Sequence, residues 1–359
     1  MQIKEKILKM KRSFFIYGLI LLCSLGKSQV QVGDSTAVTK VQAQEAYNKG
    51  VAALESKNYI EAVNLFQEAI RLNPQFAKAY YNLGVAKMEL NQVESAIEDF
   101  KKSIEIKPDS NLSFFYLGKY FYENDQLDEA LKNLQFASMF DNKNPFVFYY
   151  LGATYFLKEQ YQDALDAFNR AIVLKPDYAY AYNDRGSTKM KTEDYSGAIV
   201  DYKKAISYDP KLYFAYNNLG TAYRKSNQHK LAIEAYSQAI AQKNDYFIAY
   251  NNRGAAKFEI GDFKGALEDF QKVISLNKDY LPAYLNLSAT YFKMKDYKSA
   301  AEYAGKVIDK DPENGSAYLN RGIAKEMLRD EKGACEDWQK AYELGIKNAK
   351  AYYQQVCSE

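Results

Sequence analysis

The stretch AYYNLGVAKMELNQVESAIEDFKKSIEIKPD, residues 79–109, decides the fold of this chain. Tyr80, Leu83 and Gly84 stand at the i, i+3, i+4 spacing of one face of a helix. Ala96 and Phe100 belong to a second stripe of the same kind, and Pro108 cannot continue the helix that carries it. The stretch therefore predicts two helices joined by a turn.

The same pattern recurs every 34 residues from Ala43 to Asn348 without an insertion, which gives nine consecutive repeats. We number the positions of each repeat from 1 to 34. Position 8 is Gly in eight repeats, with Ser288 as the exception, and position 20 is Ala in all nine. A fixed period of this length indicates a solenoid, in which each repeat packs on its neighbours.

The residues at fixed positions also explain how the two helices of a repeat pack together. Small side chains at positions 8 and 20 allow the helices to cross closely, and aromatic side chains at positions 4 and 24 fill the space beside them. Proline stands at position 32 in five repeats, where the second helix has ended, and no proline falls inside a helix. We therefore expect an all-α fold.

This pattern resembles the tetratricopeptide repeat family. The resemblance implies a right-handed superhelical solenoid of antiparallel helix pairs, with the first helix of each pair lining a concave groove. In this family the groove typically holds an extended peptide or a helix of a partner protein. Family members that clamp the acidic C-terminal tail of chaperones use Lys at position 5 of one repeat, and no repeat of this chain has it.

We expect the repeats to be followed by a helix that covers the open end of the solenoid. Such a cap is needed because the last repeat has no neighbour to bury its apolar face. The expected organisation is a signal peptide at 1–28, a polar linker at 29–42, nine repeats at 43–76, 77–110, 111–144, 145–178, 179–212, 213–246, 247–280, 281–314 and 315–348, and a cap helix at 349–359.

The first 28 residues have the pattern of a secretory signal. A basic segment precedes an apolar stretch from Ser13 to Leu25, which is too short to span a bilayer comfortably. Gly26 and Ser28 are small residues that suit cleavage before Gln29. A retained membrane anchor and lipidation at Cys23 are the alternatives, although the bulky Leu22 does not suit a lipoprotein signal.

The charge of the chain without this segment argues against nucleic-acid binding. Residues 1–28 contain six of the 48 Lys and Arg residues and one of the 45 Asp and Glu residues. The remaining 42 basic and 44 acidic residues give a net charge of −2, with no basic block that could neutralise phosphates.

The resemblance places positions 2, 5, 6 and 9 of each first helix in the groove. Position 6 is Asn in six repeats, although Asn is a mediocre residue for a helix interior. An exposed amide both donates and accepts hydrogen bonds, so a row of amides can bind a peptide backbone of any sequence. A similar asparagine ladder lines the repeats of protein O-GlcNAc transferases. The candidate groove residues are Asn82, Tyr116, Tyr150, Asn183, Asp184, Asn217, Asn218, Asn251, Asn252, Asn286 and Asn320.

Position 5 divides the expected groove into an aromatic zone in repeats 1–4 and an amide-rich zone in repeats 5–7. We interpret the aromatic zone as a surface that binds side chains and the amide zone as one that binds backbone. Two alternatives stay open. The asparagines are solvated or bond to a neighbouring repeat, and the rings pack between repeats.

Repeats 5, 7 and 9 share a set of charged residues that the repeats between them lack. Joint replacement of three positions suggests that an Asp on the second helix bridges to an Arg and a Lys on the first, because a partly buried charge needs a partner. The predicted structural ion pairs join Arg185, Lys189, Asp201; Arg253, Lys257, Asp269; and Arg321, Lys325, Asp337. A charge-lined binding face is the alternative.

Few residues of the chain suit catalysis or metal binding. His229 is the only histidine, and no phosphate loop or nucleotide fingerprint is present, so we expect no catalytic residue, no metal site and no cofactor. Cys335 and Cys357 could form a disulfide that fixes the cap helix, or they are two unpaired thiols.

These observations favour a non-catalytic scaffold or adaptor that binds an extended peptide or a partner protein in its groove. We expect an exported monomer in a bacterial cell envelope or periplasm, with no integral membrane span in the mature chain and no nucleic-acid partner. The alternatives are an accessory or regulatory subunit that presents a substrate to a separate enzyme, and a structural spacer.

Overall fold

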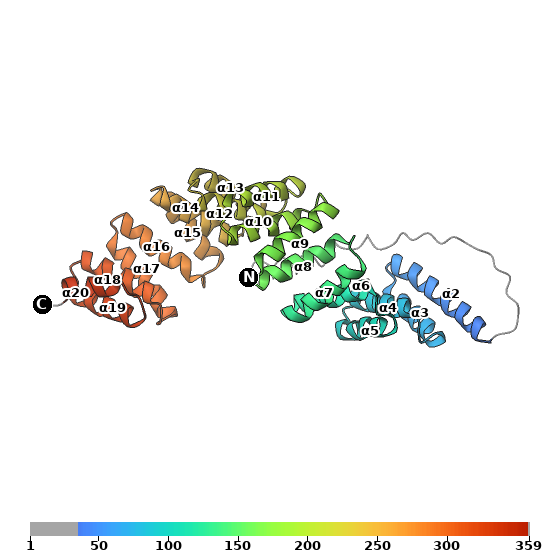
Figure 1. Ribbon diagram of the computed structural model, residues 1–359. Coiled ribbons are helices and arrows are strands. Elements are labelled where there is room, and N and C mark those ends of the chain that lie inside the picture. The colour runs from blue at the N-terminus through green and yellow to red at the C-terminus, as the bar shows by residue number, and fades with distance from the viewer. Residues whose placement is uncertain (1–34, 358–359) are drawn as a thin grey trace. The chain divides into compact units, whose positions relative to one another are not determined.

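A computed structural model describes residues 35–357, and these residues fall into two bodies that divide between Pro176 and Asp177. Within each body the helices follow one another in chain order (Figure 1). The N-terminal body contains α2 (Ser35–Glu55), α3 (Tyr59–Leu72), α4 (Ala77–Glu89), α5 (Val93–Ile106), α6 (Asn111–Glu123), α7 (Leu127–Phe140), α8 (Pro145–Leu157) and α9 (Tyr161–Leu174).

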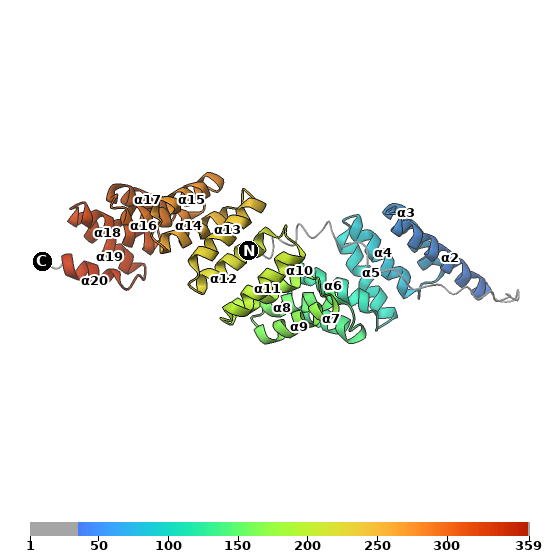
Figure 2. The ribbon, with the colours of Figure 1, turned by 90° about the horizontal axis from the view of Figure 1, so that it is seen from above.

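The C-terminal body continues the pattern with five further helix pairs and one final helix, within the range that the structure describes (Figure 2). Its helices are α10 (Ala179–Lys191), α11 (Tyr195–Tyr208), α12 (Tyr213–Lys225), α13 (His229–Gln242), α14 (Phe247–Glu259), α15 (Phe263–Leu276), α16 (Leu281–Lys293), α17 (Tyr297–Lys310), α18 (Gly315–Met327), α19 (Glu331–Glu343) and α20 (Ala349–Val356). Each repeat thus forms one helix pair, and the prediction of an all-α solenoid is confirmed.

In seven of the nine pairs the core is a ring at position 24 packed on the bare backbone of a glycine at position 8, whereas repeat 3 has Leu134 in place of the ring and repeat 8 combines Ser288 with Ala304. A Cβ atom on Gly84 would lie 2.7 Å from the Phe100 ring, and one on Gly254 would lie 2.7 Å from the Phe270 ring. Both rings are buried, as is Ala at position 20 of every repeat. Position 8 must therefore be small because the large side chain at position 24 occupies the space that a Cβ atom would need.

The turn inside each repeat passes through a left-handed residue at position 15. In eight repeats this residue is not glycine, and its φ lies between 58° at Asn227 and 65° at Arg329. Repeat 7 alone uses a glycine, Gly261, with φ of 81°. The left-handed region strains a residue with a side chain, so each of these turns is held by the packing of its two helices.

One expected boundary is wrong at the N-terminal end. Residues 35–42 belong to α2, although residues 29–42 were expected to form a polar linker. Val38 and Val41 remain 47% and 49% exposed, so these turns extend the helix without packing on the core. Hydrophobic periodicity could not predict them, because it detects only helix faces that are buried.

The proposed signal segment and Cys23 lie outside the described residues. Within residues 35–357, no helix combines the length and the hydropathy that a transmembrane span requires.

Candidate functional site

Four positions of each first helix in the C-terminal body lie on one face of that helix. Positions 2, 6, 9 and 13 follow the i, i+4, i+7, i+11 spacing, so they share a face of each first helix. At position 6 of α10, α12, α14 and α16 stand Asp184, Asn218, Asn252 and Asn286, and all four are half-buried. We call this surface the first-helix face.

The asparagines of this face are bonded from repeat to repeat. The amide Nδ2 of Asn218 donates to Oδ1 of Asn183 at 3.1 Å. In the same register, Asn252 donates to Asn217 at 2.9 Å, and Asn286 donates to Asn251 at 3.0 Å. Position 6 of one repeat therefore pairs with position 5 of the repeat before it, and we call this line of contacts the seam.

Burial separates the two halves of the first two seam pairs, whereas both residues of the third pair, Asn251 and Asn286, are half-buried. Asn183 and Asn217 are only 1% and 2% exposed, so they cannot contact a ligand, and their expected role in the groove is corrected to that of inter-repeat acceptors. Asn218, Asn252 and Asn286 are half-buried, so part of each residue remains accessible to solvent. We call these three residues the amide row.

Two further candidates of the C-terminal body lie at the ends of the seam. Asp184 accepts a hydrogen bond from Nδ2 of Asn183 at 2.8 Å. Asn320 on α18 is half-buried, and the residue at its seam position in repeat 8 is Leu285, whose side chain forms no hydrogen bond. Asn251 is also half-buried. The polar part of the seam thus runs from repeat 5 to repeat 8.

In the N-terminal body the seam uses aromatic side chains. Asn82 Nδ2 donates to the hydroxyl of Tyr47 at 2.9 Å. The Tyr81 and Tyr116 ring centroids lie 6.0 Å apart, and those of Phe115 and Tyr150 lie 5.8 Å apart. The division into an aromatic and an amide zone therefore reflects which side chains join adjacent repeats.

The tyrosines of this seam are poor ligand contacts. Tyr150 is 6% exposed and packs edge-on against Tyr122, so its expected role as a groove contact is corrected to inter-repeat packing. Tyr116 is half-buried and stacks on Phe100 with ring centroids 5.1 Å apart. Burial raises the pKa of Tyr116 and raises that of Tyr150 well above its ordinary value.

The charged residues of repeats 5, 7 and 9 meet between the two helices of each pair. In repeat 7, Arg253 donates to both carboxylate oxygens of Asp269, at 2.9 and 2.6 Å, and Lys257 Nζ lies 2.9 Å from Oδ2. Asp269 is 3% exposed. Arg185 with Lys189 reaches Asp201 in the same way in repeat 5, and Arg321 with Lys325 reaches Asp337 in repeat 9.

Repeat 2 holds a partial set of the same kind. Lys87 Nζ lies 2.5 Å from Asp99 Oδ2, but Leu83 takes the place of the arginine. Burial raises the pKa of Asp99, because a single lysine compensates only part of the desolvation of its carboxylate. The arginine of repeats 5, 7 and 9 supplies the bidentate contact that is missing in repeat 2.

The aspartate caps of these repeats were not predicted from the sequence, although glycine at position 19 belongs to the set that repeats 5, 7 and 9 share. Asp194, Asp262 and Asp330 at position 16 cap the second helices by accepting from the backbone N–H of Gly197, Gly265 and Gly333. A Cβ atom on Gly265 would lie 2.3 Å from Asp262 Oδ2. Glycine at position 19 thus accompanies an aspartate cap three residues earlier, a spacing that was visible in the sequence.

One ion pair links two successive first helices. Arg224 on α12 holds Glu259 on α14 with its Nε atom 2.9 Å from both carboxylate oxygens. His229 Nδ1 lies 3.1 Å from the same carboxylate. The hydrogen bond from Arg224 lowers the pKa of Glu259 below its ordinary value.

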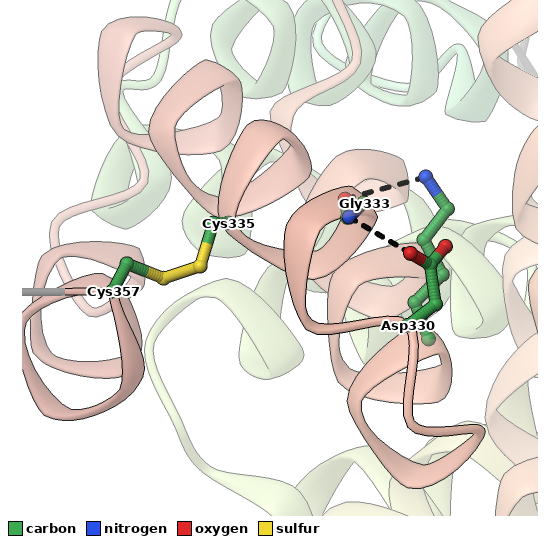
Figure 3. The surroundings of a disulfide bond; sticks show 5 residues. Asp330, Gly333, Cys335 and Cys357 are labelled. Atoms are coloured by element: carbon green, nitrogen blue, oxygen red, sulfur yellow. Dashed lines mark hydrogen bonds between the residues drawn. A yellow bond between two sulfur atoms is a disulfide. The ribbon is translucent and has the colours of Figure 1, made fainter. Parts of the chain in front are cut away.

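At the C-terminal end, Cys335 of α19 and Cys357 after α20 are joined by a disulfide (Figure 3). Tyr352 of α20 stacks on the buried Trp338 of α19, with ring centroids 5.5 Å apart. The helix α20 therefore covers α19 through one covalent and one aromatic contact. No group of three or more His, Cys, Asp or Glu side chains that could hold a metal ion occurs in residues 35–357.

Models of known repeat families match several of the repeats. Models described as "Tetratricopeptide repeat" match residues 77–110, 145–178, 247–280 and 281–314, which are four of the repeats defined above. A model described as "TPR repeat" matches residues 50–91, 186–226 and 220–261. No curated protein matches the chain.

Solved structures of similar fold include a chain of the APC/C hetero-tetramer Cut9–Hcn1, at 14% identity and a TM-score of 0.54, covering 88% of this chain and 76% of that one. YrrB, a TPR protein with an unusual peptide-binding site, matches at 23% identity and a TM-score of 0.47, over 51% and 95% of the two chains. MamA from Desulfovibrio magneticus RS-1 matches at 23% identity and a TM-score of 0.45, over 47% and 96%. The tetratricopeptide repeat models, which together match more than half of the chain, show that it belongs to the tetratricopeptide repeat family, and this supports a role as a protein–protein interaction scaffold.

Proposed function

We propose that this protein is a non-catalytic scaffold that binds an extended peptide segment of a partner on the first-helix face of its C-terminal body. The observation that carries the proposal is the amide row. Asn218, Asn252 and Asn286 are each held by the repeat before, so their orientation is fixed before any ligand arrives. A fixed row of amides can pair with a peptide backbone at little cost in side-chain entropy.

Export to a cell envelope is part of the proposal. The sequence pattern of residues 1–28 supports it, and so does the disulfide, because such bonds persist in oxidising compartments. N-terminal sequencing of the protein recovered from its native host should begin at Gln29. Recovery of the intact N-terminus in the cytosolic fraction would overturn this part.

The binding test uses a random peptide library on the immobilised protein. We expect selected peptides to lose most of their affinity when Asn218, Asn252 and Asn286 are all changed to Ala. The matched control changes Gln238, Gln242 and Asn244 to Ala, because these exposed amides lie on α13 and the turn that follows it.

A second control separates binding from packing. The Asn183→Ala, Asn217→Ala, Asn251→Ala variant removes the acceptors of the seam but keeps the amide row. It should lower the melting temperature as much as the first variant does while retaining more peptide affinity. Equal loss of affinity in the exposed control of α13 would argue against the amide row as the binding site.

A further inference from the structure

The first-helix face of repeats 5–8 carries four parallel rows of different chemistry. Position 2 is apolar or aromatic, position 6 is the amide row extended by Asp184, position 9 is small, and position 13 is mostly basic. In the order of the four positions the rows are Tyr180, Phe214, Ile248, Pro282; Asp184, Asn218, Asn252, Asn286; Ser187, Thr221, Ala255, Ala289; and Lys191, Lys225, Glu259, Lys293.

The position 13 row is a mostly cationic rim, whose three lysines lack ion-pair partners in the part of the chain that the structure describes. Lys191, Lys225 and Lys293 are exposed, and none of them forms an ion pair within the described residues. The one carboxylate of the row, on Glu259, is already held by Arg224 with a shortest contact of 2.6 Å. The rim therefore presents three uncompensated positive charges.

The position 2 row forms the opposite, apolar rim. Tyr180, Phe214 and Ile248 are half-buried, and the ring centroids of Tyr180 and Phe214 lie 5.9 Å apart across adjacent repeats. Pro282 continues the row on α16 and is exposed. Position 9, between the amide row and the cationic rim, carries only small side chains, and all four are half-buried.

An extended peptide that crosses the first helices would meet both rims at once. Its backbone would lie on the amide row, and its side chains would point alternately to the two sides. Adjacent packed helices lie about 8–10 Å apart, so four repeats offer roughly 24–30 Å, the length of about eight residues in a strand.

We infer that this face recognises an extended segment in which apolar or aromatic residues alternate with Asp or Glu. The inference rests on the proposed function and adds the ligand's side-chain pattern to it. Alternate carboxylates would pair with Lys191, Lys225 and Lys293, while the apolar residues between them would pack along Tyr180, Phe214 and Ile248.

The test measures fluorescence anisotropy with four labelled ten-residue peptides. The first alternates Val or Phe with Glu, the second has the same composition in two blocks, the third has Lys in place of Glu, and the fourth has Ser in place of Glu. We expect the first peptide to bind at least about tenfold more tightly than the others, with an advantage that shrinks as salt is added.

Charge reversal provides the matched variants. Lys191→Glu, Lys225→Glu and Lys293→Glu together should weaken binding of the acidic peptide by roughly 3- to 30-fold and improve binding of the lysine peptide. The control reverses Lys230, Lys264 and Lys298, three exposed lysines in the first turns of α13, α15 and α17. It should leave both affinities unchanged. Lys225→Glu alone, with a smaller effect in the same direction, serves if the triple variant does not fold.

The outcomes separate the inference from the proposed function. Equal affinity for the acidic and the serine peptides, with both lost on changing the amide row to Ala, would retain peptide binding and overturn the alternating pattern. Failure of all four peptides and of the random library to bind would overturn the proposed function itself. Displacement of the acidic peptide by a single-stranded oligonucleotide at equal concentration would also overturn the inference.

Discussion

Asp269 is a carboxylate that the fold buries with two cations around it. Arg253 and Lys257 both contact it, and their side chains remain 19% and 17% exposed. The neighbouring repeats 6 and 8 have Leu and Tyr at the two cationic positions, so the same space is filled in two chemically different ways. The three charged residues therefore fill the space that Leu and Tyr fill in the neighbouring repeats. They stabilise the fold only when all three are present.

We expect Asp269→Ala to destabilise the C-terminal body by about 3 kcal/mol, because it leaves Arg253 and Lys257 without their partner. The triple variant Arg253→Leu, Lys257→Tyr, Asp269→Ala copies the set of repeat 6, namely Leu219, Tyr223 and Ala235, and should recover most of this loss. Urea unfolding and hydrogen exchange of α14 and α15 measure both variants. A triple variant less stable than the single one would contradict this account.

The ion pair of Glu259 should make the stability of the C-terminal body depend on pH in the acidic range. The pKa of Glu259 is lowered from 4.5 by the hydrogen bond from Arg224, so its ionised form is favoured by folding. This stabilisation is present above about pH 4.5 and is lost as the pH falls through the lower pKa of the folded state. The melting temperature should therefore fall less steeply below that pH in Glu259→Gln than in the unaltered protein. Parallel acid profiles for the two would show that the pair does not contribute.

Contacts within one repeat could be predicted from the sequence more fully than contacts between repeats. The charged sets could be predicted because three replacements at fixed positions coincide in three repeats. Bonding of the asparagines to a neighbouring repeat was one of the alternatives that the sequence left open, but the partners could not be identified because they stand 35 residues apart and come together only when adjacent repeats stack. The asparagine column was visible, but its pairing and the burial of Asn183 and Asn217 depend on that stacking.

At the scale of elements, the helix α20 is the weakest part of the C-terminal body. It has eight residues, too few for a helix that is stable alone, and it packs on α19. Its sequence restarts the repeat pattern at Tyr352. The disulfide from Cys335 to Cys357 compensates for this short interface by closing the chain around it.

Reduction of this disulfide should release α20 and leave α18 and α19 folded. The chain-entropy estimate for a loop of 22 residues gives about 3 kcal/mol, which is enough to hold a single short helix. Trp338 is the only tryptophan, so its emission should shift to longer wavelength as Tyr352 leaves its face. The Cys335→Ser, Cys357→Ser variant should show the shifted emission with or without reductant. Unchanged emission and amide protection of α20 after complete reduction would contradict the prediction.

The helix boundaries were predictable wherever packing repeats itself. First helices begin at position 1 and second helices at position 17, as in α4 at Ala77 and α5 at Val93. The start of α2 at Ser35 was not predictable, because its first turns are exposed and carry no apolar stripe.

On the scale of the whole molecule, the solenoid should tolerate loss of a complete period. Deleting residues 247–280 removes repeat 7 and brings Asn286 into the seam position beside Asn217, so an amide pair forms again. We expect a folded protein with lower helical content and a lower melting temperature, because stability in such arrays is nearly a sum over repeats and their interfaces.

The control for this prediction deletes residues 247–263, half of a period. It joins second helices without a first helix between them, and circular dichroism should show a much larger loss of helix. Similar melting curves for the two deletions would mean that the register of repeats matters less than their number.

Glycine substitutions in the left-handed turns at position 15 should raise the thermal stability of the chain. Lys57, Glu159, Glu193, Lys295 and Arg329 adopt a conformation that costs an ordinary residue about 1–2 kcal/mol, whereas Gly261 adopts it in repeat 7 without a side chain. Glycine also increases the conformational entropy of the unfolded chain, which offsets part of the relieved strain. Each substitution by glycine would therefore raise the free energy of unfolding by only a fraction of that cost. The gains would accumulate along the array, and a thermostable version could be built without altering a residue of the first-helix face.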